Sequence, residues 1–216
     1  MQLIFDFDGT LVDSLDAVIT NYNILAEENN FRKIESVESD VIRNLNSKEL
    51  IKYLKIPIYK IPAILLKARK MMSGEICSLV PISHLPQVLQ KLHDANFSLG
   101  IVSSNSEENV QSWLATNNME NLFTFIHSEP NFFGKAHVIR KFLNKYKSDK
   151  QRVFYIGDET RDIDAARQNE IYSIAVTWGF NSEAILAQHQ PDYMAKTPQD
   201  LLAICGLPEE AGEIKN

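Results

Sequence analysis

The chain has 216 residues, 44% of them hydrophobic, and a formal net charge of -6. This length and composition are typical of one globular core with a smaller satellite domain, and they exclude a chain that is disordered throughout. The negative charge argues against nucleic acid or an anionic membrane as the main partner.

The first predicted element is a short buried strand that ends in a polar turn. The apolar run Leu3 to Phe5 is followed by Asp6, Asp8 and a break at Gly9-Thr10. Alternate residues of a strand share a face, so both carboxylates should leave the strand on the same side. Two adjacent carboxylates repel each other, which indicates a bound cation or a shared proton. An aspartate pair in an ordinary turn is the alternative.

Residues 15–80 show helical apolar spacing and no strand pattern. Ser47 is a candidate N-cap for a helix over residues 48–55, and Pro62 suits the first turn of a further helix. Apolar residues at steps of three and four predict a helix over residues 11–30. These residues are Leu15, Val18, Tyr22 and Leu25. We therefore expect a block of helices directly after the first strand.

From Pro81 onward, strand patterns alternate with helix patterns. This alternation predicts an α/β fold with a doubly wound parallel sheet, whose ligands bind at the carboxyl ends of the strands. Helices are clearest at 135–146 and 161–169, and Thr197 is a candidate cap of the last one. The strands are predicted at residues 97–102, 122–126, 153–156 and 173–176. Three polar breaks follow strands, at residues 6–10, 103–106 and 157–162.

The second polar break contains Ser103, Ser104 and Asn105. Its hydroxyl groups and the free N–H groups of a helix N-terminus suit a phosphate oxygen. Ser106, placed before two glutamates, is also a good helix cap. Phosphate binding and simple capping both remain open for this break.

A lysine and two aspartates complete the candidate site. Lys135 opens a helix, where a cation is unfavourable, so it is either solvated or directed into an acid-rich cleft. Asp158 ends a strand, and Asp162 lies four residues later on the same helical face. Several carboxylates at strand ends are the oxygen ligands that Mg²⁺ takes together with water and phosphate. Capping of the next helix is the alternative for Asp158.

Other chemistries lack support in the sequence. The five histidines show no H-x-x-x-H pairing, and no Walker loop, G-x-G-x-x-G or G-x-S-x-G pattern occurs. No apolar run approaches the ~20 residues of a membrane span, and the N-terminus lacks the features of a signal peptide. Cys77 and Cys205 have no metal-type spacing and should be free thiols, so we expect a cytoplasmic protein.

With these residues placed, the chain resembles the haloacid dehalogenase superfamily of hydrolases, in its phosphoglycolate phosphatase-like branch. Four segments carry the resemblance, at residues 6–14, 101–105, 135 and 155–162. The resemblance spans residues 1 to about 203. It implies a Rossmann-like core made of residues 1–14 and 81–216, with a small helical cap inserted at 15–80.

The resemblance also implies a role for each catalytic residue. Asp6 would be the nucleophile that forms an aspartyl-phosphate, which divides hydrolysis into two easier steps. Asp8 would protonate the leaving alkoxide and then deprotonate the attacking water. Ser103 and Lys135 would hold the phosphoryl group that is transferred. The presence of Asp8 argues for phosphoryl transfer, because the dehalogenases of the superfamily lack this second aspartate.

By the same resemblance, the cofactor would be Mg²⁺. Its ligands would be Asp6, the main-chain carbonyl of Asp8 and Asp158, with Asp162 orienting a metal-bound water or Lys135. Substrate or phosphate contacts would come from Gly9, Thr10, Ser104 and Asn105. Three positions depart from the family pattern: Ser103 replaces a frequent Thr, Ala136 a frequent Pro, and Glu159 a frequent Ser or Thr. Glu159 is therefore a candidate to share the metal.

The leading hypothesis is a Mg²⁺-dependent phosphatase for a small phosphorylated metabolite, with phosphoglycolate or a sugar phosphate as candidates. A phosphomutase is the alternative, and Arg43 and Lys48 could hold its second phosphate unless they are merely solvated charges. A non-catalytic module that binds a phosphorylated ligand is a third hypothesis. The sequence indicates neither the substrate nor the oligomeric state.

Overall fold

The computed structural model describes residues 1–128 and 134–208. Its centre is a six-stranded sheet in which all neighbouring strands are parallel, in the order β3-β2-β1-β4-β5-β6. The strands are β1 (Gln2–Phe5), β2 (Ser98–Ser103), β3 (Phe123–Ser128), β4 (Val153–Gly157), β5 (Tyr172–Val176) and β6 (Tyr193–Ala195). The predicted doubly wound α/β fold is confirmed.

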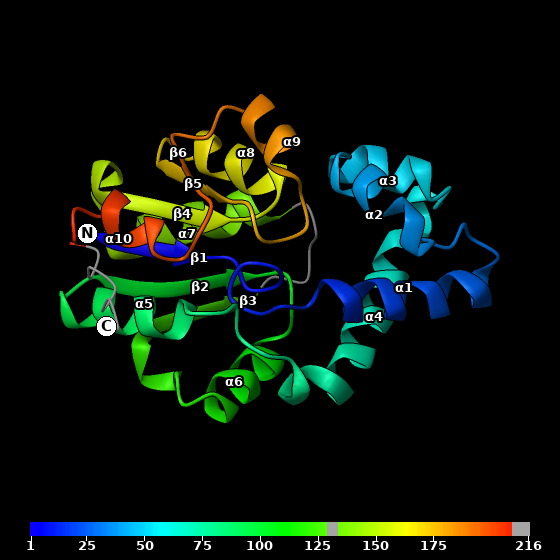
Figure 1. The fold of residues 1–216 in the computed structure, drawn as a ribbon, viewed down its shortest axis with the longest axis horizontal. Helices are drawn as coiled ribbons and strands as arrows, with labels where there is room; N and C mark the ends of the chain where they lie inside the picture. The colour runs from blue at the N-terminus through cyan, green and yellow to red at the C-terminus, as the bar shows by residue number, and fades with distance from the viewer. Residues whose placement is uncertain (129–133, 209–216) are drawn as a thin grey trace, which may run out of the picture.

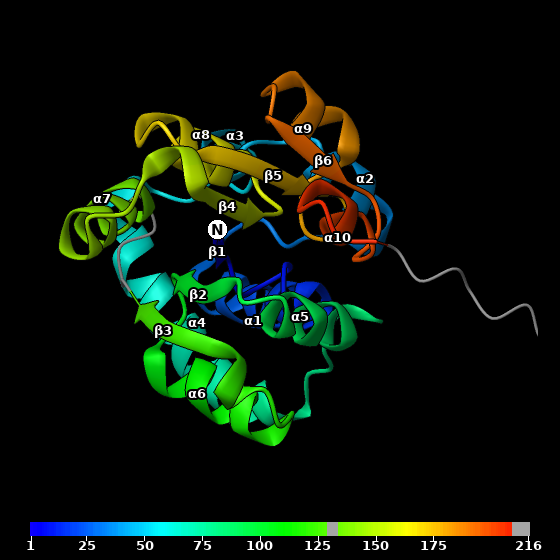
Figure 2. The same cartoon turned by 90° about the vertical axis from the view of Figure 1, so that its left-hand side faces the viewer.

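Helices cover both faces of the sheet, as Figure 2 shows. On one face, the strand residues Leu3, Phe5 and Ile101 belong to a core cluster that includes apolar residues of α5 (Leu85–Asp94), α6 (Glu107–Thr116) and α10 (Asp200–Ile204). On the other face, Ile4 and Tyr155 pack with α7 (Lys135–Tyr146) and α8 (Thr160–Gln168), and α9 (Glu183–Gln188) adds a smaller cluster. Consecutive strand residues are therefore both buried, which explains the uninterrupted apolar runs.

The position of β1 in the middle of the sheet decides where the first aspartate lies. Phe5 pairs with Ile101 of β2 on one side and with Ile156 of β4 on the other. The backbone N–H of Asp6 then donates to the carbonyl of Ile156 at 2.8 Å. Asp6 therefore leaves the sheet at the centre of its carboxyl edge, where ligands of such sheets bind.

Of the five α-helices between β1 and β2, the first four lie beyond the carboxyl edge of the sheet (Figure 1), while α5 packs on the sheet. They have a small apolar cluster of their own around Ile34, Ile42 and Leu54, while Met72 and Ile76 pack into the main core. We call α1 to α4 the inserted helices: α1 (Leu15–Asn29), α2 (Ser39–Arg43), α3 (Ser47–Tyr53) and α4 (Ile61–Glu75). Short 3-10 turns complete the chain at Ser36–Glu38, Ile58–Lys60, Ile76–Ser78, Glu120–Leu122 and Lys150–Arg152.

Two helix starts differ from the sequence prediction. The first helix starts at Leu15 and not at residue 11, because the N–H groups of Leu11 and Val12 donate to the carbonyl of Phe7 in a tight turn. The N-cap of α3 is Asn46 and not Ser47, because the Asn46 side chain accepts hydrogen bonds from two backbone N–H groups of the first turn.

Differences also occur near the C-terminus. The last helix starts at Asp200, whose carboxylate accepts the N–H of Thr197 at 2.9 Å, whereas Thr197 was expected to cap it. The short strand β6 was not predicted. Residues 209–216, which belong to the expected core, lie outside the described residues.

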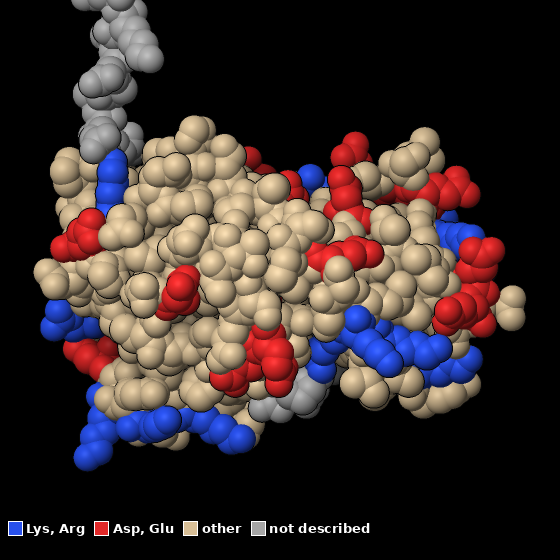
Figure 3. Space-filling model, turned by 90° about the horizontal axis from the view of Figure 1, so that it is seen from below, with Lys and Arg blue, Asp and Glu red and all other residues tan. Residues whose placement is uncertain are grey.

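The surface carries charges of both signs. Seen from the side on which α6 lies, acidic and basic side chains are interspersed over the sheet-bearing part and over the inserted helices (Figure 3). In the described part of the chain, we find no helix with the length and hydropathy that crossing a bilayer requires. The two cysteines are free thiols.

Candidate active site

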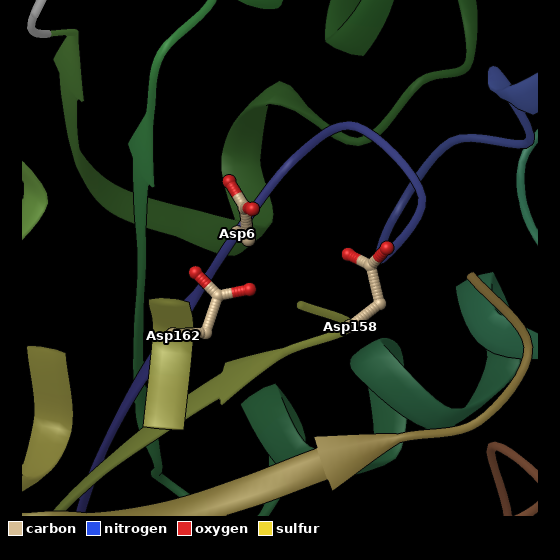
Figure 4. A group of neighbouring side chains, drawn as sticks. All are labelled: Asp6, Asp158 and Asp162. Carbon is tan, nitrogen blue, oxygen red and sulfur yellow. The ribbon is translucent and has the colours of Figure 1, made fainter. Parts of the chain in front are cut away.

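Three buried carboxylates meet at the carboxyl edge of the sheet. Asp6 follows β1, Asp158 follows β4, and Asp162 lies in the first turn of α8 (Figure 4). One oxygen atom from each can be chosen so that all three lie within 4.8 Å of one another. Such a cluster of oxygen donors suits a hard divalent cation, since like charges at this spacing otherwise repel.

Lys135 neutralises part of this charge. Its ammonium donates to Oδ2 of Asp6 at 2.6 Å and to Oδ1 of Asp162, and it is only 6% exposed. Burial favours the neutral amine, yet the charges of Asp162 and Asp6 outweigh burial and raise the pKa of Lys135. The lysine at the start of α7 is therefore directed into the acidic cleft and is not solvated.

Asp158 is fully buried and held from two sides. Its Oδ1 accepts the hydroxyl of Thr10 at 2.6 Å, and its Oδ2 accepts the N–H of Phe180 at 2.7 Å. Burial raises its pKa well above the usual range, and the negative charges of Glu159, Asp6 and Asp162 add to this. The protein itself provides little positive charge to balance the Asp158 carboxylate. A bound cation would supply that charge.

Two glycines make room for Asp158. A Cβ atom on Gly9, whose φ is +76°, would lie 2.4 Å from Oδ2 of Asp158. A Cβ atom on Gly179 would lie 2.3 Å from the same side chain. The backbone at both positions therefore approaches the carboxylate more closely than any other residue would permit.

Asp162 also stabilises the start of α8. Its Oδ2 accepts the N–H of Glu159 at 3.0 Å, and the Glu159 side chain reciprocates in a capping box. Burial raises the pKa of Asp162 to about 6, with the positive charge of Lys135 acting in the opposite direction. The N-cap of α8 is thus Glu159, so the carboxylate of Asp158 is left for other contacts.

Glu159 itself faces a cation and the inserted helices. Its carboxylate pairs with the Arg161 guanidinium and accepts the hydroxyl of Ser47 at 3.4 Å. Within residues 1–128 and 134–208, the cluster of acidic residues that could hold a metal consists of Asp6, Asp158 and Asp162. Glu159 is not part of it. Its sequence-based role as a metal ligand stays a prediction.

Asp8 has the properties of an acid that works near neutral pH. Burial and the charge of Asp6 raise its pKa to about 6. Its Oδ2 accepts the side-chain N–H of Asn105 at 3.1 Å, whereas the buried Oδ1 has no hydrogen-bond partner in the described chain. Asn105 therefore fixes one oxygen, and the buried Ser14 hydroxyl, which also lowers the pKa of Asp8, lies close to this carboxyl group.

The second polar break lies beside Asp8. The buried Ser103 hydroxyl accepts the N–H of Asn105 at 2.9 Å, and Ser104 is half-buried. Ser106 caps α6 by accepting the N–H of Asn109 at 3.2 Å. Capping is thus the role of Ser106, while Ser103 and Ser104 lie at the end of β2 beside the carboxylates.

A chain of amides connects Asp8 with the inserted helices. Oδ1 of Asn105 accepts from Nδ2 of Asn109 at 2.8 Å, and Oδ1 of Asn109 accepts the hydroxyl of Ser73 on α4 at 2.8 Å. Burial lowers the pKa of Arg69, also on α4, and the charge of Asp8 acts against this, which puts the two groups within electrostatic range. Asn109, Ser73 and Arg69 had no motif that could have revealed them.

The loop after β5 was likewise missed by sequence reasoning. Phe180 donates to Asp158, and Asn181 accepts the N–H of Thr160 at 2.9 Å. The amide of Asn181 also donates to the carbonyls of Arg43 and Leu45, which joins the loop to the inserted helices. A polar break after a strand was the available signal, since Gly179-Phe180-Asn181 follows the strand ending at Val176.

The two cationic residues suggested for a second phosphate have different surroundings. The Arg43 guanidinium donates to the carbonyl of Thr177 at 3.5 Å. Lys48 lines a polar cavity of about 300 Å³ together with Lys135 and Arg161.

Comparisons with known proteins agree with this geometry. The family model described as haloacid dehalogenase-like hydrolase matches residues 3–176. The chain belongs to this family. Phosphoglycolate phosphatase of Synechococcus elongatus is 30% identical over 200 residues, which cover 93% of this chain and 94% of that protein.

Pyrophosphatase PpaX of Oceanobacillus iheyensis is 24% identical to this haloacid dehalogenase-like hydrolase, over 94% of this chain and 96% of the relative. The crystal structure of a predicted phosphatase from Clostridium acetobutylicum shares the fold with a TM-score of 0.81 at 20% identity, covering 95% of this chain and 98% of the other. The chain is thus a phosphatase in the phosphoglycolate phosphatase-like branch, as the sequence predicted.

Proposed function

We propose that the protein is a Mg²⁺-dependent phosphatase that hydrolyses a phosphomonoester of a small molecule through an aspartyl-phosphate on Asp6. The observation that carries this proposal is that Asp6 and Asp8 have different surroundings at the carboxyl edge of the sheet. Asp6 lies between Lys135 and two further carboxylates, while Asp8, with a pKa of about 6, stands outside that group. One aspartate is arranged for charge compensation and the other for proton transfer.

In the first step, a carboxylate oxygen of Asp6 attacks phosphorus, and the bond from phosphorus to the leaving oxygen breaks. Asp8 transfers its proton to that oxygen, so the alcohol leaves neutral. In the second step, water attacks the phosphorus of the aspartyl-phosphate, and Asp8 takes up the proton of the water. The bond to Asp6 then breaks, inorganic phosphate leaves, and the carboxylates return to their starting states.

Mg²⁺ would be held by Asp6, Asp158 and the main-chain carbonyl of Asp8, with Asp162 orienting a metal-bound water or Lys135. The raised pKa values of Asp158 and Asp162 support this assignment, because a cation would compensate both groups. When bound, the cation supplies charge neutralisation that lets a carboxylate approach a phosphate dianion.

The remaining site residues are assigned to the phosphoryl group. Ser103 and Lys135 would hold its oxygens, and Gly9, Thr10 and Ser104 would surround it. The amide of Asn105 is directed at Asp8, so we assign Asn105 to the orientation of that acid as well as to the substrate region. The partner is a small phosphorylated metabolite, and phosphoglycolate, a sugar phosphate and pyrophosphate are the first candidates to assay.

The inserted helices would act as a cap over the core. We assign residues 15–80 to the cap, and residues 1–14 and 81–216 to the core. Hydrogen bonds from the loop after β5 to Arg43 and Leu45, and from Ser73 to Asn109, support a cap that touches the core on both sides of the site.

The test is phosphate release by the purified full chain from a panel of phosphomonoesters, with Mg²⁺ and with a chelator. The wild type should release phosphate only with the metal, and Asp6→Asn should release none while it still unfolds in a single cooperative transition. Asp16→Asn, which changes an exposed carboxylate of α1, is the matched control and should retain full activity. Substantial turnover by Asp6→Asn would remove Asp6 as the nucleophile. Interconversion of sugar phosphates with little free phosphate would indicate a mutase instead.

A further inference from the structure

The inserted helices line most of an apolar cavity of about 240 Å³. Aliphatic side chains of α1, α3 and α4 form most of its wall, among them Val18, Leu50 and Leu65. Figure 1 shows these helices beyond the carboxyl edge of the sheet. Protein interiors are normally packed as tightly as organic crystals, and an apolar hollow of this size is destabilising while it is empty.

One end of the cavity lies beside the candidate active site, at residues that adjoin or contact Asp158, while Asp6, Asp8 and Lys135 are not part of its lining. Glu159, Phe180 and Asn181 line it there. Glu159 is the neighbour of Asp158 in the chain, and the N–H of Phe180 donates to Asp158 at 2.7 Å. A group attached to a phosphate at the carboxylates therefore has an apolar space on its Asp158 side.

The charge of the wall selects against an anionic occupant. The lining contains no Lys or Arg from the described chain, and its one carboxylate is Glu159. Tyr22 adds no charge, because a phenol is neutral at pH 7, and burial raises its pKa further, to about 12. The carboxylate of phosphoglycolate or the second phosphate of pyrophosphate would lie here without a counter-charge, at a high desolvation cost.

Polar groups in the wall are few, and most of them are already bonded elsewhere: the Tyr22 hydroxyl donates to the carbonyl of Arg32 at 2.6 Å, and Glu159 pairs with Arg161. The amide of Asn21, which is 2% exposed, donates to the sulfur of Met72 at 3.3 Å. A thioether is a weak acceptor, and its side chain is flexible enough to move for a ligand. The wall is thus suited to a hydrocarbon group with at most one polar atom.

We infer that the cavity binds the leaving group and that the preferred substrate is the phosphate monoester of an apolar alcohol. This inference rests on the proposed function and specifies which class of alcohol the substrate contains. An apolar cavity of 150 Å³ binds benzene, so one of about 240 Å³ accommodates roughly eight to ten carbon atoms. A medium-length alkyl or branched aliphatic alcohol matches both the volume and the charge of the wall.

The experiment measures kcat/KM with Mg²⁺ for methyl, butyl, hexyl, octyl and dodecyl phosphate, beside phosphoglycolate, pyrophosphate and glycerol phosphate. Each added methylene group should raise kcat/KM by about fourfold, the equivalent of its transfer out of water, up to roughly eight to ten carbons. A plateau or decline should follow at dodecyl phosphate. Calorimetric titration with octyl phosphonate and methyl phosphonate should give the same order of affinity without turnover.

Neighbouring leucines on α4 provide a matched pair of variants. Leu65 lines the cavity, whereas Leu66 is 68% exposed. Leu65→Trp should fill the space and lower the ratio of kcat/KM for octyl phosphate to that for methyl phosphate at least tenfold. Retained turnover of methyl phosphate would show that the variant is folded. Leu66→Trp should leave the preference unchanged.

The outcomes separate this inference from the proposed function. Hydrolysis of polar or short esters with no gain from chain length would overturn the apolar-alcohol assignment and leave the phosphatase intact. A chain-length preference that persists in Leu65→Trp would also overturn the assignment to this cavity. Octyl phosphonate that binds to a protein unable to hydrolyse any ester would support the cavity and contradict the proposed function.

Discussion

Replacement of Lys135 by methionine tests the electrostatics of the site through stability. The lysine is buried and contacts Asp6 and Asp162, which are also buried. Methionine keeps much of the side-chain volume but leaves two carboxylates without their cation. Breaking a buried pair in this way costs about 3–5 kcal/mol, and 1 kcal/mol corresponds to about 2–4 °C in a domain of this size. We therefore expect the Tm of metal-free protein at pH 7.5 to fall by roughly 6–20 °C.

The assay is thermal unfolding with a chelator, and Lys141→Met, an exposed position on the same helix, is the control. The loss should shrink as pH falls, because Asp162, whose pKa is about 6 while Lys135 lowers it and rises when that charge is removed, then takes up a proton and no longer needs a cation. A fall of less than 3 °C, or a fall equal to that of Lys141→Met, would refute the assignment of Lys135 as the counter-charge.

Three further predictions concern the carboxylates. Asp158→Ala should raise the Mg²⁺ concentration for half-maximal activity at least tenfold, and an unchanged metal titration would remove Asp158 as a ligand. Asn105→Ala removes a hydrogen-bond donor from Asp8 and should raise the pKa of Asp8 above about 6. The alkaline limb of the kcat/KM profile should therefore move up by about one pH unit. A shift of that limb to lower pH would contradict this prediction. Metal-free protein should be more stable at pH 5 than at pH 7.5. The raised pKa values of Asp8, Asp158 and Asp162 mean that the native state holds more protons than the unfolded state. The free energy of unfolding therefore falls as pH rises through about 6. Equal Tm values at the two pH values would contradict that reasoning, and saturating Mg²⁺ should remove the difference.

Local patterns were sufficient to predict most elements of the core. The helix over residues 135–146 has the predicted bounds, and its apolar residues Val138, Ile139, Phe142 and Leu143 are buried as their spacing indicated. The strand after Arg152 also lies where its apolar run predicted it. The strand Tyr193–Ala195 was missed because three residues are too few to show alternation.

The hydrogen bonds that orient the carboxylates of the site join residues far apart in the chain, and no local sequence pattern predicts them. The contact between Asn105 and Asp8 joins residues 97 positions apart, and that between Thr10 and Asp158 joins residues 148 positions apart. Phe180 reaches Asp158 only because β5 lies beside β4, which follows from strand order and not from composition. Strand ends could therefore be predicted as a site, but the partners of each carboxylate could not.

The central place of β1 has a consequence for the protein as it leaves the ribosome. β1 is synthesised before both strands that it pairs with, and the second of these, β4, begins only at Val153. At about 5–20 residues per second, the nascent chain waits roughly ten to thirty seconds before β1 is paired on both sides. During that interval the apolar residues Leu3 to Phe5 lack their β4 partner, and unpaired strand edges are templates for aggregation. Chaperone demand should accordingly be set by the time of translation up to β4, and slow codons before residue 153 should lower the yield of active protein.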